Sequence, residues 1–249
     1  MAQSVKSTKV GRQRNTGGSL LELDFDHVAF DPKGPVAPQI TGALRDLIKH
    51  NILQPGQRLS EAEISGRFGF SRQPVREAFI KLAEESLLEI RPQRGTYVRK
   101  ISLAAVMDAR FVREAIEADV VRLCASQSDA ALVRELRDQL AAQQREAEKP
   151  APSFVPLDDL FHRTLCESVG HPNAWAVIES LKSQLDRVRQ MATEQFPLSE
   201  LVAQHAAIVD AIEQHEPAAA ESSLRLHLQR ILSDLPKIRE RYADLFEPT

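Results

Sequence analysis

The chain has 249 residues, a formal net charge of −3 and 43% hydrophobic residues, which suits two modest folded domains better than one. No apolar run reaches the ~20 residues that a membrane helix needs, and the N-terminus lacks the apolar core of a signal peptide. We therefore expect a soluble, cytoplasmic protein without a membrane partner. Cys124 and Cys166 have no CxxC spacing, so we expect two small buried side chains rather than a disulfide or a nucleophile.

The overall charge hides an asymmetry along the chain. Residues 36–100 hold 11 Lys/Arg against 7 Asp/Glu, whereas residues 101–249 hold 16 against 24. A small basic segment joined to a larger acidic one is typical of a DNA-binding module attached to a domain with another task. Residues 1–35 complete the predicted division into three parts, as a disordered tail and lead-in without apolar periodicity.

A helix is predicted first, over residues 36–51, because Ile40, Leu44, Leu47 and Ile48 form one apolar stripe. The next helix is short. Its predicted start is a capping box, in which the side chains of Ser60 and Glu63 would each satisfy a free backbone N–H of the other residue. Gly69 ends that helix.

A second short helix follows at once, with Ser71 as its predicted N-cap and Pro74 in its first turn, where a missing N–H costs nothing. Leu87–Ile90 and Thr96–Arg99 are predicted as the two strands of a hairpin. Three helices followed by a hairpin make a winged helix-turn-helix over residues 36–100.

The candidate DNA contacts lie at two places in this module. Arg72, Gln73 and Arg76 share a polar face at the start of the second helix of the pair, which enters the major groove in such modules. Arginine can donate two hydrogen bonds to a guanine edge, and glutamine can recognise adenine. Arg94 and Gly95 form the hairpin tip, which can reach a phosphate or the minor groove. The alternative is a solvated helix face with a basic hairpin.

The segment from Pro55 to Val98 closely resembles the DNA-binding domain of GntR-family bacterial transcription regulators. The resemblance is carried by these elements: Pro55-Gly56, Leu59-Ser60-Glu61, Ser71-Arg72-x-Pro74-Val75-Arg76-Glu77-Ala78, Leu82 and Arg94-Gly95-Thr96-Tyr97-Val98. It implies that Ser71, Arg72, Arg76 and Gly95 lie at the DNA. Some members carry a DNA-contacting arginine where this chain has Ala62, so that contact is absent here.

Residues 101–249 are predicted to be an all-helical bundle. Prolines, glycines and polar turns separate six helical segments: 102–126, 129–148, 154–169, 173–194, 198–215 and 217–245. In the first of them, the stripe expected to face the core is Leu103, Met107, Phe111, Ala115 and Ala118.

Four residues in the bundle could hold a metal ion. Asp158 and His162 lie one helical turn apart, and His205 and His227 each occur in a helix among apolar neighbours. One oxygen and three nitrogens would suit a first-row transition metal and leave coordination positions open. The alternative is a surface pair at 158 and 162, with the other two histidines bonded to backbone groups in the core.

The bundle resembles the ligand-binding domain of the FadR subfamily of GntR regulators. These motifs carry the resemblance: Asp158-x-x-Phe161-His162-x-x-Leu165, Gly170-His171-Pro172-Asn173, Glu200-x4-His205-x2-Ile208-x2-Ala211-Ile212 and His227-Leu228. In metal-binding members the matching Asp and three His bind a divalent ion. We expect zinc, with nickel or manganese as alternatives. The resemblance also implies that Arg113 holds an effector carboxylate; alternatively it only pairs with Glu117, four residues on.

The sequence therefore predicts a DNA-binding transcription regulator and not an enzyme. It is expected to be a homodimer on a two-fold symmetric double-stranded DNA operator and a repressor whose affinity changes when a small carboxylate or sugar acid binds at the metal site. Two rivals remain open: a DNA-binding protein whose bundle only dimerises around a structural metal, and a metal-dependent hydrolase with a DNA-binding appendage.

Overall fold

The computed structural model describes residues 30–150 and 152–248. The predicted disorder of residues 1–19 lies outside these ranges. Helices α1 (Val36–Lys49), α2 (Glu61–Phe68) and α3 (Arg72–Glu84) and strands β1 (Arg58–Leu59), β2 (Leu88–Arg91) and β3 (Gly95–Val98) form a winged helix-turn-helix. The two-residue strand β1 was not predicted. It extends the hairpin into an antiparallel sheet of order β1-β3-β2.

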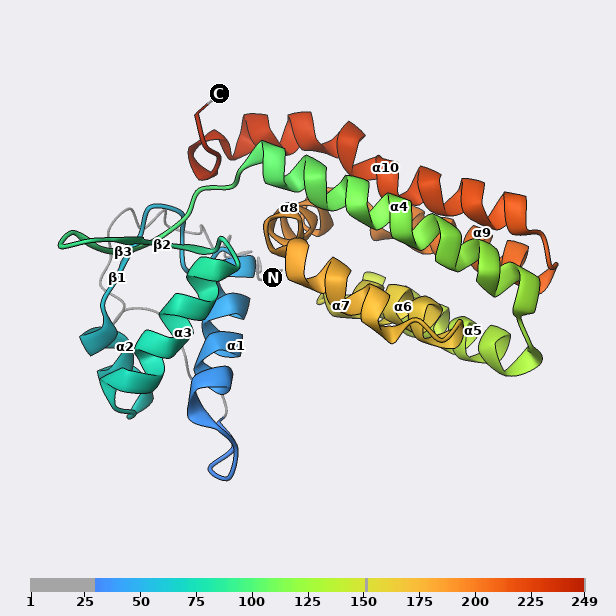
Figure 1. Cartoon of the computed structure of the whole chain (residues 1–249). Helices are drawn as coiled ribbons and strands as arrows, with labels where there is room; N and C mark the ends of the chain where they lie inside the picture. Colours follow the sequence, from blue (N-terminus) through green and yellow to red (C-terminus); the bar gives the residue numbers. More distant parts are fainter. Residues whose placement is uncertain (1–29, 151, 249) are drawn as a thin grey trace, which may run out of the picture.

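The apolar pattern of this module places its core as predicted. Ile40, Leu44, Leu47 and Ile48 of α1 are fully or almost fully buried. They pack in one cluster with side chains of α2, α3 and the sheet, such as Phe79. The turn between β2 and β3 projects from the side of the module that is remote from the bundle (Figure 1).

Neither predicted side-chain cap is formed in this module. Ser60 and Ser71 occupy the N-cap positions of α2 and α3 with extended backbone, but neither side chain accepts a hydrogen bond from its helix. Local sequence identified where both helices begin. Ser71 is exposed at the start of α3, so water can satisfy its hydroxyl in place of the helix end.

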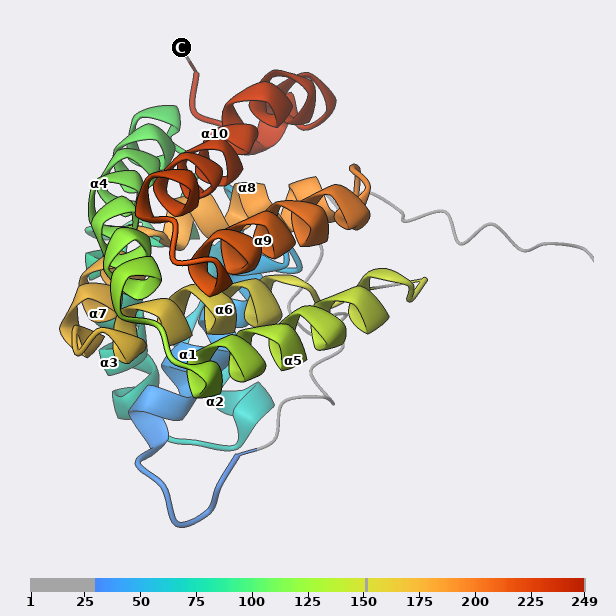
Figure 2. The same cartoon turned by 90° about the vertical axis from the view of Figure 1, so that its right-hand side faces the viewer.

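The C-terminal half is helical in the described residues. Its elements are α4 (Leu103–Gln127), α5 (Ala130–Ala147), α6 (Val155–Ser168), α7 (Pro172–Leu181), α8 (Ser183–Thr193), α9 (Leu198–Glu213), α10 (Pro217–Arg241) and the 3-10 turn η2 (Ala243–Leu245). Helices α4 and α10 lie side by side along one edge of the bundle (Figures 1 and 2). The segment after η2 pairs with the connection between the domains, since Ile101 N donates to Leu245 O at 2.8 Å and Glu247 N to Ile101 O at 3.0 Å.

Two expectations about the bundle are wrong. The predicted single helix over 173–194 is two helices, α7 and α8, which meet at Lys182 in different directions (Figure 1). Lys182 is almost fully buried there and donates to Asp159 and Asp186 at 2.6 and 2.7 Å, so long-range ion pairs accompany the break. The local sequence contains no Gly or Pro to signal it.

The second wrong expectation concerns which face of α4 is buried. Met107, Phe111 and Ala115 of the predicted stripe are exposed, and Phe111 retains 65% of its accessible surface. The buried face instead carries Arg113 and Glu117, 3% and 2% exposed, between apolar residues. A hydrophobicity pattern assigns charged residues to the surface, so it selected the opposite side of this helix.

Candidate metal centre and nucleic-acid interface

The four candidate metal ligands come together inside the bundle. Asp158 and His162 are one turn apart on α6, His205 is on α9 and His227 is on α10. All four are buried, and one ligand atom from each lies within 4.8 Å of the others. The alternative of a surface pair at 158 and 162 is therefore excluded, because neither side chain is on the surface.

The three imidazole rings direct the same nitrogen inward. His227 Nε2 lies 3.2 Å from His162 Nε2 and 3.2 Å from His205 Nε2. Carboxylate oxygens of Asp158 lie 3.6 Å from His162 Nε2 and 3.4 Å from His205 Nε2. The inward atoms thus surround a common point.

Each outward ring nitrogen has an oxygen beside it. His205 Nδ1 is 2.7 Å from Gln143 Oε1 and His227 Nδ1 is 3.2 Å from Gln204 Oε1, both in hydrogen-bond geometry. His162 Nδ1 is 2.6 Å from Glu117 Oε2, a close ion-pair contact that is not aligned as a hydrogen bond. An acceptor at Nδ1 places the proton of a neutral ring on that nitrogen, so Nε2 keeps its lone pair. Three lone pairs that face one another at these distances cannot bond to each other. A cation between them satisfies all three, and the donor set fits a divalent transition metal.

At Asp158, His205 and His227, electrostatics favour the protonation states that metal binding requires. Burial lowers the pKa of His205 to about 3, and burial together with the neighbouring histidines holds the pKa of His227 well below its usual value. Burial alone would raise the pKa of Asp158, but Arg189 and the histidines outweigh it and hold that pKa well below its usual range. Neutral imidazoles and an ionised carboxylate are the forms that coordinate a metal.

Gln143 offers a direct test of the outer partners. Its side chain is fully buried, and Nε2 donates to Leu157 O at 3.3 Å, which turns Oε1 toward His205. We expect Gln143→Leu to weaken Zn²⁺ binding by about 10- to 100-fold, because the ring loses the acceptor that fixes its tautomer. Isothermal titration calorimetry checks this. The exposed neighbour Gln144→Leu is the matched control, and equal affinities in the two variants would contradict the assigned role.

Arg113 forms the predicted pair with Glu117, while its role toward an effector stays a prediction. Its Nε donates to Glu117 Oε1 at 2.7 Å, and Glu117 Oε2 lies beside His162, so the ion pair contacts one of the candidate ligands. Burial would raise the pKa of Glu117, but Arg113 and His162 outweigh it and lower that pKa to about 2. Arg113 Nη2 is buried and donates to no acceptor in the described residues, which leaves it available to a bound anion.

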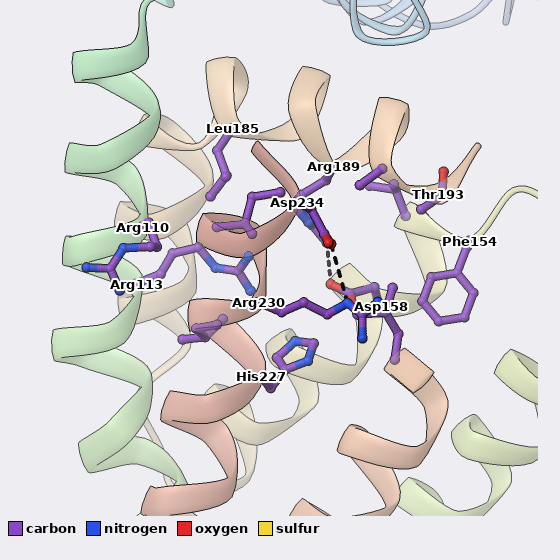
Figure 3. A pocket seen from close by; sticks show the side chains of 15 residues that line it. Arg110, Arg113, Phe154, Asp158, Leu185, Arg189, Thr193, His227, Arg230 and Asp234 are labelled. Atoms are coloured by element: carbon purple, nitrogen blue, oxygen red, sulfur yellow. Dashed lines mark hydrogen bonds and ion pairs between the residues drawn. The ribbon is translucent and has the colours of Figure 1, made fainter. Parts of the chain in front are cut away.

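A small cavity of about 70 Å³ adjoins the metal centre. Besides Asp158, His227 and Arg113, it is lined by the further arginines Arg189 and Arg230, which come from α8 and α10 (Figure 3). The remaining wall is mainly apolar, with residues such as Leu185 and Ile231. The cavity therefore combines arginines that could bind an anion with an apolar space that could hold the rest of a small ligand.

Several residues around the four candidate ligands were not predicted from the sequence. Glu117 was considered only as a partner of Arg113, and Gln143, Arg189 and Arg230 carried no motif. Gln204 is adjacent to His205 in the chain but faces His227, 23 residues away. Their contacts join different helices, so no local spacing could have found them.

The side chains predicted to contact DNA from α3 differ in whether another side chain of the protein already binds them. Arg72 is exposed in the first turn, and among the described residues no carboxylate pairs with it. Arg76 is instead held by Glu61 of α2 through two hydrogen bonds of 3.0 Å, and Gln73 donates to Glu77 at 3.1 Å. Glu61 thus orients Arg76 across the helix pair, and base contact by Arg76 would compete with that ion pair.

The wing has a defined shape at its tip. Arg94 is exposed, and its carbonyl accepts a hydrogen bond from the Tyr97 hydroxyl at 3.0 Å. Gly95 has φ +109°, and a Cβ there would lie 2.8 Å from Arg58 Nε. Any side chain at this position would strain the backbone and displace Arg58, a basic residue that the sequence reasoning did not include.

Comparison with known proteins follows the same division. Residues 37–98 match the family model for bacterial regulatory proteins of the gntR family, and residues 108–230 match the FCD domain. The HTH-type transcriptional repressor RspR of Escherichia coli (strain K12) is 43% identical over 219 residues, which are 87% of this chain and 96% of that protein. A probable D-xylose utilization operon transcriptional repressor of Paenarthrobacter nicotinovorans is 30% identical, over 78% of this chain and 87% of that protein.

Solved structures share the fold at low sequence identity. E. coli McbR/YncC superimposes with a TM-score of 0.70 at 19% identity, over 84% of this chain and 99% of that chain. A putative transcriptional regulator GntR from Rhodococcus sp. RHA1 gives a TM-score of 0.66 at 24% identity, over 83% and 98% of the two chains.

A winged helix-turn-helix joined to a helical ligand-binding domain defines the chain as a DNA-binding transcription regulator. It belongs to the gntR family of bacterial regulatory proteins, in the FadR-like group with an FCD domain. Its relatives are regulators rather than enzymes, so the prediction that the chain is not an enzyme is confirmed and the hydrolase alternative is set aside. Within the described residues, no helix is long and apolar enough to cross a membrane.

Proposed function

We propose that this chain is a repressor that binds a two-fold symmetric operator as a homodimer and changes its affinity when a small organic or sugar acid binds in the FCD domain. The names of RspR and of the Paenarthrobacter protein support repression. The observation that carries the proposal is the buried Asp158/His162/His205/His227 set, which adjoins an arginine-lined cavity in the domain joined to the DNA-binding module. Regulation of a bacterial operator places the protein in the cytoplasm.

The ion that fits these ligands best is Zn²⁺, with Ni²⁺ or Mn²⁺ as alternatives. When bound, it supplies a Lewis-acid anchor for a carboxylate oxygen. Arg113 then contributes its unpartnered Nη2 to the same anion, and a guanidinium is well suited to a carboxylate. The apolar wall near Leu185 and Ile231 bounds the ligand body.

A gel-shift titration tests this function. An operator selected in vitro from random duplexes is titrated with the Zn²⁺-loaded protein, with and without small acids that raise the thermal midpoint of the protein. Release of the operator by one of these acids supports the proposal. If no acid alters operator binding and Zn²⁺ removal unfolds the bundle, the structural-metal alternative replaces it.

For the DNA-binding surface we propose Ser71, Arg72, Gln73, Arg76, Arg94 and Gly95. All belong to the start of α3 or the tip of the wing, and the five side-chain-bearing residues are exposed. Arg72 is assigned the strongest base contact, since it carries no competing ion pair in the described residues. Glu61 holds Arg76 in place beside it.

The outward stripe of α4 supports the homodimer. Met107 and Phe111 form an apolar row that the folded monomer leaves exposed, and Leu226 on the adjoining helix α10 is 65% exposed. A second copy related by a two-fold axis would cover the same row on both chains. Such apolar anchors dominate the energy of many interfaces.

Phe111→Asp is expected to weaken the dimer by about 2 kcal/mol or more, roughly 30-fold, because a carboxylate replaces an apolar anchor on both sides of the axis. Sedimentation velocity over a concentration series measures the change. Val177→Asp on α7 replaces another exposed apolar side chain, 49% accessible, and should leave the dimer intact. Unchanged association of the Phe111 variant would place the interface elsewhere.

A further inference from the structure

Helix α8 is the element of the bundle on which the DNA-binding module rests. Its side chains donate three hydrogen bonds to backbone carbonyls of that module and its connection: Ser183 Oγ to Glu85 O (2.8 Å), Gln184 Nε2 to Ser86 O (2.5 Å) and Arg187 Nη1 to Arg99 O (2.8 Å). The fourth link is an ion pair, from Lys49 Nζ at the end of α1 to Asp186 Oδ2 at 2.7 Å.

The same helix reaches the metal centre on its other side. Arg189, one turn after Asp186, donates to Asp186 Oδ1 at 2.6 Å and forms a short hydrogen bond with the candidate ligand Asp158. A continuous chain of ion pairs therefore joins Asp158 to Arg189, Arg189 to Asp186, and Asp186 to Lys49 of the DNA-binding module.

The directly bonded groups of this chain are balanced in charge. Asp159 accepts from both Arg189 and Lys182, and Lys182 also donates to Asp186. The cluster thus holds three carboxylates and three cations, listed in full as Asp158, Asp159, Asp186, Lys49, Lys182 and Arg189. Any net charge added at Asp158 disturbs this balance.

Two open clefts adjoin the contact between α8 and the DNA-binding module. A cleft of about 410 Å³ is lined by Lys49 of α1, by His50 directly after it, and by Asp159 and Arg163 of α6. Another of about 480 Å³ is lined by Arg45 of α1, the end of α3 and α7. The contact at α8 therefore borders two clefts that are open to solvent.

We propose that the Asp158–Arg189–Asp186–Lys49 chain is the link by which the metal and effector site controls the docking of the DNA-binding module. This inference rests on the proposed function of that site. A divalent ion at Asp158 would add two positive charges beside a balanced cluster, because histidines coordinate a metal in their neutral form. The hydrogen bond between Arg189 and Asp158 would weaken, and Arg189 would bind Asp186 more strongly. The cluster would then carry an excess of positive charge.

Lys49 is the cation that this excess displaces. Its side chain is 21% exposed and belongs to the other domain, whereas Lys182 and Arg189 are 1% and 12% exposed and belong to α8 itself. Metal binding therefore loosens the module at the end of α1. A carboxylate ligand of the metal returns negative charge to the cavity and restores the Lys49–Asp186 contact.

Hydrogen–deuterium exchange on the full chain tests the link with Zn²⁺ alone as the probe. Saturating Zn²⁺ is expected to speed exchange of residues 46–53 and 83–88 by about two- to fivefold, the range for loss of one partly exposed ion pair. In Lys49→Met the link is already cut, so these segments should exchange fast without Zn²⁺ and show no further change with it. Lys81→Met, which changes an exposed lysine paired with Glu84 on α3, is the matched control and should respond as the wild type does.

Calorimetry on the same samples separates the possible failures. If Zn²⁺ binds and exchange of the two segments is unchanged or slower, the link is wrong while the metal site stands. If Zn²⁺ does not bind, the proposed metal site is wrong and the link falls with it. A Lys49→Met protein that still responds to Zn²⁺ as the wild type does would also overturn the link.

Discussion

Arg72→Ala is expected to abolish specific operator binding and to leave the metal site intact. Arg72 lies in the first turn of α3 with no competing carboxylate in the described part of the chain, so its guanidinium is free to bond a guanine edge. A bidentate contact of this kind contributes about 1–3 kcal/mol, and a dimer loses it twice, about 2–6 kcal/mol in all. Fluorescence anisotropy at a fixed salt concentration measures the loss, since affinity for DNA depends steeply on salt.

Lys81→Ala is the matched control for this variant. Lys81 is an exposed cation on the same helix, but it lies near the far end of α3 and pairs with Glu84. It should bind the operator nearly as the wild type does. If Arg72→Ala retains wild-type affinity and base preference, α3 does not recognise the operator through its first turn.

His205→Ala is expected to abolish Zn²⁺ binding and leave operator binding largely intact. The change removes one of the three inward nitrogens. The Zn²⁺ affinity should therefore fall further than in Gln143→Leu, where loss of an outer partner is expected to weaken binding by about 10- to 100-fold. At a free Zn²⁺ concentration of 100 times the wild-type Kd, the ion stabilises the wild type by about 2.7 kcal/mol, and this gain should be missing in the variant. Thermal unfolding with and without Zn²⁺ measures it.

Whether the His205→Ala variant is folded can be measured separately from its metal binding. His205 is fully buried beside Phe161, so the truncation leaves a cavity, and circular dichroism and operator binding show whether the bundle persists. A folded His205→Ala protein with full metal occupancy would mean that the ligand set is wrong. The Zn²⁺ affinity of Gln143→Leu should lie between those of His205→Ala and the wild type.

Regular periodicity predicted most helices closely. The helix expected over 129–148 spans Ala130–Ala147, and the one expected over 154–169 spans Val155–Ser168, because both carry an apolar stripe between clear breaks. The break at Lys182 was missed since it accompanies buried ion pairs with Asp159 and Asp186 rather than Gly or Pro. Contacts between separate helices leave no local pattern.

The site shows the same division between local and long-range information. The turn spacing of Asp158 and His162 and the family resemblance led to the four candidate ligands, which the fold brings together. The orientation of the rings depends on Glu117, Gln143 and Gln204, whose contacts cross the bundle. On α4, the charged residues Arg113 and Glu117 lie on the buried face, so the hydrophobic pattern predicted the wrong face as the core. The exposed face that it selected is the proposed dimer surface.

The most direct test of metal-dependent control is operator affinity measured in three states of the wild-type protein: metal-free, Zn²⁺-loaded, and Zn²⁺-loaded with a small acid selected by thermal shift. Site-to-site coupling of ordinary strength changes affinity about 5- to 150-fold. We predict at least a fivefold difference between two of these states at constant salt, and no difference in His205→Ala. The same affinity in all three states, with calorimetry showing Zn²⁺ and acid bound, would contradict control of the DNA-binding module by this site.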